Sequence, residues 1–146
     1  METLSVDALE MTRAQSGSTR AFWRWSVGSM QDALSEAGDQ WHELAVSIDA
    51  PPTALPFWYA SLYEAFGKID DPVVVHRLYH GRRLAAVLSL TFHEGMYRVW
   101  RPYQYRKHTA FWTFAFDGEI EGIGSEIRRH LLSSADLVDL AYVPID

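Results

Sequence analysis

The sequence predicts an α/β domain in which helices flank both faces of a mixed, mostly antiparallel sheet. Residues 72–101 contain three β-branched and aromatic runs, Pro72–Tyr79, Leu84–Phe92 and Met96–Arg101, joined by short links that contain Gly. This pattern is typical of an antiparallel meander. The middle run is apolar at both alternating sets of positions, so packed elements should cover both of its faces. Helical apolar patterns before and after the meander would supply that cover.

The residues before the meander predict a strand followed by two helices. Large apolar and polar residues alternate in Ala21–Val27, as in a strand. Ser29 is a suitable N-cap for a helix over Met30–Ile48, which has one apolar stripe. A second, aromatic helix over Pro56–Phe66 is apolar on more than one face, so we expect it to be buried between the sheet and another element.

The residues after the meander predict a strand, a helix and a final strand. These are Thr109–Phe116, Glu119–Ser133 and Leu137–Val143. Because the final strand follows a helix, we expect it to lie parallel to its neighbour. Residues 1–18 lack periodicity and are expected to form a flexible N-terminal tail, leaving one domain over residues 19–146.

Composition excludes several classes of protein. A chain of 146 residues, 48% hydrophobic and 22% charged, is typical of one soluble domain. The absence of Cys excludes disulfides, zinc–thiolate sites and thiol catalysis, and it fits a cytoplasmic location. No apolar run is long enough to span a membrane, and we expect no membrane insertion.

Charge is unevenly distributed along the chain. Residues 1–71 hold 4 Lys/Arg and 11 Asp/Glu, whereas residues 76–108 hold seven Lys/Arg, four His and one Glu. A local positive field on an acidic protein favours a small anionic ligand or an acidic partner, and it argues against nucleic acid. The alternative is a solvated sheet edge that these charges protect from pairing.

The most specific short signal is the glycine-containing segment Glu119–Ser125, between a predicted strand and a helix. Gly122 and Gly124 would let backbone amides approach a phosphate at the helix N-terminus, with Ile123 within the turn and Ser125 adding a hydroxyl. Alternatively, the glycines only relieve crowding where the helix leaves the sheet. Two Glu residues within the segment oppose an anion.

Other groups of polar residues give weaker signals. His76 and His80 have the spacing of a helical metal pair, but on a strand they would be roughly 13 Å apart, so no metal site is predicted. No nucleophile elbow, Walker loop or Ser/His/Asp pattern occurs, and the catalytic residues remain unknown.

The order of elements resembles the GNAT (Gcn5-related N-acetyltransferase) fold. Gly122–Leu132 is similar to the family motif Gln/Arg-x-x-Gly-x-Gly/Ala, with Gly122 and Gly124 at the two glycine positions and Glu119 at the Gln/Arg position. The resemblance implies that the amides of this segment cradle the pyrophosphate of acetyl-CoA or another acyl-CoA.

A closer resemblance is to the N-terminal half of tandem-GNAT proteins, the cellulose-biosynthesis-type acetyltransferases and Fem-like aminoacyltransferases. Pro56–Gly67 is similar to their "PF…W…A" helix, His80–Leu90 to their central hairpin, and Leu137–Pro144 to their closing strand. In that comparison the chain stops before the last GNAT strands, and a second GNAT-like half would hold the acyl-donor site.

Two functions follow as alternatives. One is an acyltransferase domain that takes part in N-acyl transfer from coenzyme A to a small-molecule or peptide amine, inactive on its own if it is an incomplete half. The other is a non-enzymatic module that pairs through the strand Leu137–Val143 with a partner domain or a second copy of itself.

Overall fold

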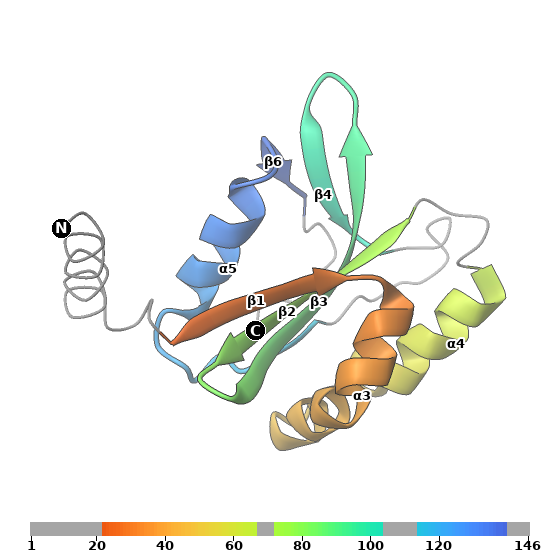
Figure 1. The fold of residues 1–146 in the computed structure, drawn as a ribbon, viewed down its shortest axis with the longest axis vertical. Coiled ribbons are helices and arrows are strands. Elements are labelled where there is room, and N and C mark those ends of the chain that lie inside the picture. The colour runs from red at the N-terminus through yellow and green to blue at the C-terminus, as the bar shows by residue number, and fades with distance from the viewer. Residues whose placement is uncertain (1–21, 67–71, 104–113, 140–146) are drawn as a thin grey trace, which may run out of the picture.

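The computed structural model describes residues 22–66, 72–103 and 114–139, which form a mixed six-stranded sheet with helices on both faces (Figure 1). The strands are β1 (Trp23–Gly28), β2 (Val73–His80), β3 (Arg83–Glu94), β4 (Arg98–Pro102), β5 (Ala115–Phe116) and β6 (Leu137–Val138). The helices are α3 (Met30–Ser47), α4 (Pro56–Phe66) and α5 (Ile123–Leu132), with a 3₁₀ turn η1 (Pro52–Ala54). The predicted tail over residues 1–18 lies outside the described residues.

The meander at the centre of the sheet is confirmed. β2, β3 and β4 are consecutive antiparallel neighbours, and β1 joins the outer edge of β2. A two-residue turn connects β2 to β3, with Gly81 at φ 64°, as a type II′ hairpin requires at its first central position. β3 is buried continuously from Leu84 to Thr91, as expected for a strand covered on both faces. It extends to Glu94, so the predicted turn at His93 was placed too early.

The sheet is mixed because the α5 crossover brings β6 back parallel to β4. Val99 lies opposite Leu137 and Trp100 opposite Val138, which confirms the predicted parallel pairing. The other strand pairs are antiparallel. Positions 140–143 of the predicted final strand lie outside the described residues.

β4 and β5 both pair with the same edge of β3. β4 lies opposite residues 90–94 of β3, and β5 lies opposite Ala86 and Val87. Only the last part of the predicted strand Thr109–Phe116 is therefore seen, as β5, because residues 104–113 lie outside the described residues. β5, the second of the two strands along this edge, directly precedes the glycine-containing segment.

Helix α3 covers one face of the sheet. Its N-terminus is set by Ser29, whose side-chain oxygen accepts a hydrogen bond from the Asp32 amide at 3.1 Å. Trp41 is buried against this face, packs against Tyr59 of α4, and donates its indole N–H to the Ala54 carbonyl at 2.9 Å. The helix bends at Ala37, whose φ is −139°, directly before Gly38.

Helix α4 packs mainly against α3 and η1, not between the sheet and another element as predicted. Tyr59 and Leu62 reach the core on the α3 side, but Phe57 is 61% exposed. The prediction of a largely buried α4 was wrong because α3 already occupies the sheet face, which leaves α4 an outer position (Figure 1).

Helix α5 covers the opposite face. Ile123, Ile127 and Leu131 pack against sheet residues that alternate with those facing α3, among them Leu78 and Leu88. The helix begins at Ile123 rather than at the predicted Glu119, since the preceding residues form turns. The shorter helix places the glycine pair at its first residues.

Candidate functional site

The segment before α5 is held in place by Asp117, directly after β5. Its carboxylate forms an ion pair with Arg83 at 2.7 Å and accepts a hydrogen bond from the Glu119 amide at 3.1 Å. The Asp117 amide donates to the Ala85 carbonyl at 2.9 Å. These bonds tie the segment to β3, so the chain enters α5 from a fixed position.

The turn at Gly122–Ser125 leaves backbone amides unpaired. Gly122 is the N-cap of α5 in the left-handed conformation, at φ 82°, and makes no side-chain capping bond. The Ile123 amide donates to the Ile120 carbonyl at 3.2 Å, whereas the amides of Gly124 and Ser125 have no acceptor among the described residues. No atom lies within 4 Å of a Cβ added at Gly124, so this side of the turn is open.

The structure places all four predicted binding residues at the N-terminus of α5. Gly122 shapes the turn, and Gly124 and Ser125 present amides at the positive end of the α5 dipole. Ile123 differs from the other three, because its amide is used within the turn and its side chain is buried. The pattern of glycines could not reveal that internal bond.

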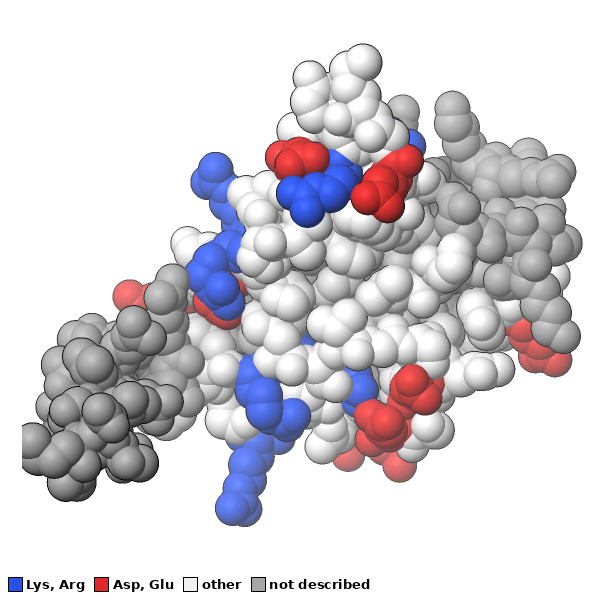
Figure 2. Space-filling model, turned by 45° about the horizontal axis from the view of Figure 1, so that its top comes forward, with Lys and Arg blue, Asp and Glu red and all other residues white. Residues whose placement is uncertain are grey.

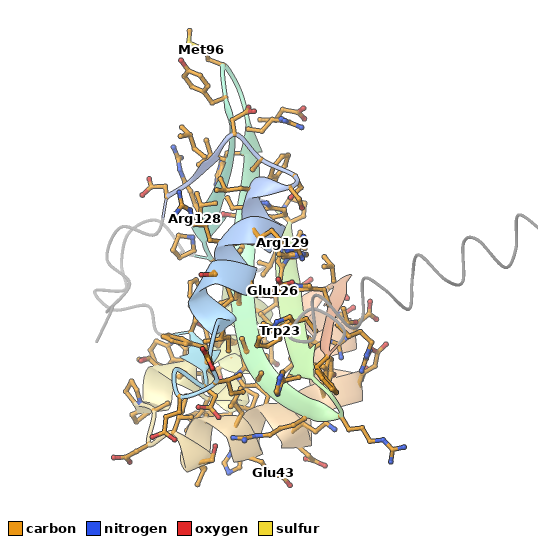
Figure 3. The ribbon with its side chains drawn as sticks, turned by 90° about the vertical axis from the view of Figure 1, so that its left-hand side faces the viewer. Trp23, Glu43, Met96, Glu126, Arg128 and Arg129 are labelled. Carbon is orange, nitrogen blue, oxygen red and sulfur yellow. The ribbon has the colours of Figure 1, made fainter. Side chains whose placement is uncertain are left out.

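Carboxylates near the turn oppose an anion. Glu119 and Glu121 are exposed beside it. Glu126, in the first turn of α5, is buried and pairs with Arg129 at 2.6 Å (Figure 3). Because Arg129 largely compensates Glu126, the two exposed Glu residues are the main opposing charges.

The expected local positive field is mostly neutralised by pairing. Five Arg residues of segment 76–108 lie in the described part, and four of them have a carboxylate partner from another part of the chain. The pairs are Arg77–Glu36, Arg83–Asp117, Arg98–Asp136 and Arg101–Asp139, at 2.7, 2.7, 3.1 and 3.8 Å. Arg82 has no ion-pair partner among the described residues. Figure 2 shows the result on one face, small groups of both signs rather than one extended basic patch.

A second polar cluster lies between α5 and the sheet, and the sequence analysis did not find it. His76 of β2 and His130 of α5 are hydrogen-bonded, Nδ1 to Nε2, at 2.9 Å. The His130 ring stacks on Trp25 with centroids 3.7 Å apart, and the edge of His76 meets Trp100 at 4.6 Å. Trp25 in turn donates its indole N–H to Glu126 at 3.0 Å. The cluster joins β1, β2 and β4 to α5.

Burial governs the protonation of this pair. Desolvation, with the nearby His130 charge as a smaller cause, lowers the pKa of His76 to about 3. Desolvation and Arg129 lower the pKa of His130, while Glu126 acts in the opposite direction. His76 is only 2% exposed, so it cannot reach a substrate, and we assign the pair a structural role.

The sequence does contain a signal for this pair, although the sequence analysis considered His76 only together with His80, as a possible metal pair. His76 shares its strand face with Leu78, and His130 lies three residues after Ile127 on the α5 stripe. These positions place both rings in the layer between helix and sheet. Among the described residues, no group of three or more His, Cys, Asp or Glu could hold a metal ion.

Comparison with known proteins gives no relative for this chain. No family model, curated protein or solved structure matches it. Within the described ranges, none of the helices is both long enough and apolar enough to cross a membrane. The order of the elements and the geometry at the start of α5 are therefore the features of the chain that bear on its function.

Proposed function

We propose that this chain is a GNAT-like domain whose α5 N-terminus binds the pyrophosphate of acetyl-CoA or another acyl-CoA, for N-acyl transfer to an amine. The observation that carries the proposal is the crossover from β5 through α5 to β6, parallel to β4, with an open glycine turn at its start. The order of elements agrees with the GNAT-like resemblance of the sequence.

The amides of Gly124 and Ser125 would hold phosphate oxygens, and Gly122 would set the direction of the turn. Arg83 and Asp117 would act indirectly, because they fix the segment that leads into the turn. Bound acyl-CoA would supply a thioester carbonyl. The amine nitrogen would form a C–N bond to that carbonyl carbon as the C–S bond breaks, and coenzyme A would leave as the thiol, carrying the proton that the amine loses. No described residue is assigned as the general base.

A thermal-unfolding assay with acetyl-CoA tests the proposal. A ligand that binds only the native state raises the unfolding temperature by mass action, so millimolar acetyl-CoA should raise it. Gly124→Trp should abolish the shift because the indole fills the open side of the turn while the fold is kept.

The matched control is Gly95→Trp in the β3–β4 hairpin, where an added Cβ also meets no atom within 4 Å. This variant should retain the shift of the unmodified protein. Absence of any shift with the unmodified protein, or an equal shift in both variants, would contradict binding at this turn.

The sheet border supports a second candidate, a non-enzymatic module that pairs with a second GNAT-like half or another copy of the chain. Among the described strands, β6 has a partner on one side only, and Leu137 on it is half-exposed. If the chain pairs with another copy, size-exclusion chromatography over a range of concentrations should show self-association, and Leu137→Lys should suppress it. If the unmodified protein elutes as a monomer at every concentration, pairing between two copies of the chain is contradicted.

A further inference from the structure

A groove of about 460 Å³ lies on the α3 side of the molecule and shares no residue with the turn at the start of α5. Its walls are the C-terminal half of α3 and the β2–β3 turn with the first residues of β3. The residues that line it are Gln40, Glu43, Leu44, Ser47, Arg82, Arg83 and Leu84. This size suits a small molecule. In Figure 1 the β2–β3 turn lies beside α3, and Figure 3 labels Glu43 at the same end of the molecule.

The two walls carry opposite charges that have no ion-pair partner among the described residues. Arg82 lies on the hairpin wall. Among the five described Arg residues of segment 76–108, it is the one without a carboxylate partner in the described part of the chain. Glu43 on the helix wall is exposed and likewise has no ion-pair partner there. They line one groove without forming an ion pair with each other, so each can bind an opposite charge on a ligand.

The groove also has an apolar floor and a fixed wall. Leu44 and Leu84 are each 3% exposed, which places hydrocarbon beneath the charged rims. Arg83 is held by Asp117, so the hairpin wall is anchored. A ligand with only a negative charge would be repelled by Glu43, and one with only a positive charge by Arg82.

We propose that this groove binds a small zwitterion of the α-amino-acid type. Its carboxylate would bind Arg82, its ammonium group would bind Glu43, and a short apolar side chain would rest on Leu44 and Leu84. Guanidinium is suited to this role because its planar fork matches a carboxylate. The proposal does not depend on coenzyme A binding, since the groove shares no residue with the Gly122–Ser125 turn.

The test is an NMR titration of the ¹⁵N-labelled full chain with L-leucine and with two analogues that each lack one charge. 4-Methylpentanoate has the carboxylate without the amine, and 3-methylbutylamine has the amine without the carboxylate. L-Leucine should shift the amides of Arg82, Arg83 and Glu43 in a saturable manner. Each analogue should bind about tenfold or more weakly, because one charge-assisted contact is missing.

Variants locate the two charges. Arg82→Gln and Glu43→Gln should each weaken L-leucine binding about tenfold or more. Arg128→Gln, on the exposed surface of α5, is the matched control and should leave the affinity unchanged. All three positions are exposed, so the spectra should remain those of the folded protein.

The proposal is overturned by any of three results. These are no saturable shift with millimolar L-leucine, shifts confined to residues away from the groove, or equal binding of L-leucine and the two analogues. Failure of acetyl-CoA to bind at the start of α5 would not affect it, because the groove shares no residue with the Gly122–Ser125 turn.

Discussion

The two helices that cover the sheet bury different kinds of side chains. α3 spans 18 residues and its buried residues are all apolar: Met30, Ala33, Ala37, Trp41, Leu44 and Ala45. α5 spans 10 residues and buries Ile123, Glu126 and Leu131, so one of its three buried side chains is a carboxylate. The half-buried His130 adds a titratable ring to the α5 interface.

This difference indicates how each face of the sheet contributes to the stability of the protein. The α3 side is held mainly by apolar packing, which does not change with protonation. The α5 side depends on His76, His130, Glu126 and Trp25 being paired with one another, so its stability should depend on pH. α5 also presents the open glycine turn, which places the candidate site on the more polar and less heavily packed helix.

Removing the largest buried side chain of α3 should have the greatest effect on stability. Trp41→Ala loses the packing against Tyr59 and the hydrogen bond to Ala54, and it should lower the free energy of unfolding by about 3–5 kcal/mol. Urea denaturation followed by circular dichroism measures this. Val46→Ala, on the exposed side of the same helix, should change it by less than about 0.5 kcal/mol. Similar losses for both variants would contradict the assigned core.

The free energy of unfolding should fall as pH is lowered. The pKa of His76 is about 3 in the folded state and returns towards 6.5 on unfolding, so below 6.5 the unfolded chain binds more protons than the folded one. Stability from this residue is present above pH 6.5 and is lost as pH falls towards 3. Between pH 7 and pH 5 the loss should be about 2 kcal/mol, and the lowered pKa of His130 acts in the same direction.

Urea denaturation at a series of pH values measures this dependence. Glu126 and Arg129 of α5 face the pair and belong to the same network. His76→Leu removes the titrating group and should flatten the curve between pH 7 and pH 5. An unchanged slope in this variant would show that other residues control the acid sensitivity of the α5 side.

The two glycines at the start of α5 should respond in opposite ways to the same substitution. Gly122→Ala should destabilise the protein by about 1–2 kcal/mol, because a Cβ is unfavourable in the left-handed conformation at φ 82°. Gly124→Ala should be neutral or stabilising by up to about 1 kcal/mol, since Gly124 lies within the helix and the added Cβ meets no atom within 4 Å. Equal destabilisation would contradict this N-cap geometry.

The sequence predicted best the elements that local pattern controls. The alternation in β2 and β3, the glycine turn between them, and the Ser29 cap before α3 each depend on residues close together in the chain. The parallel direction of β6 also followed, because a crossover through a helix imposes it.

Contacts between distant residues explain most of what the sequence could not predict. His76 and His130 are 54 positions apart, and Arg83 and Asp117 are 34 apart, so no local pattern links them. α5 begins at Ile123 and not at the predicted Glu119. The Asp117 carboxylate and the Ile120 carbonyl accept hydrogen bonds from the amides of Glu119 and Ile123, which holds these residues in turns. The spacing of Gly122 and Gly124 before a helical pattern predicted a binding turn there, but the use of the Ile123 amide inside the turn required the structure.

The central claim, that the start of α5 binds the pyrophosphate of an acyl-CoA, is tested most directly at the two open amides. An NMR titration of the ¹⁵N-labelled chain with acetyl-CoA should shift the amide resonances of Gly124 and Ser125 in a saturable manner, with smaller changes elsewhere. The account is contradicted if those two resonances do not move while the ligand is present at millimolar concentration, or if the shifts are confined to other parts of the protein.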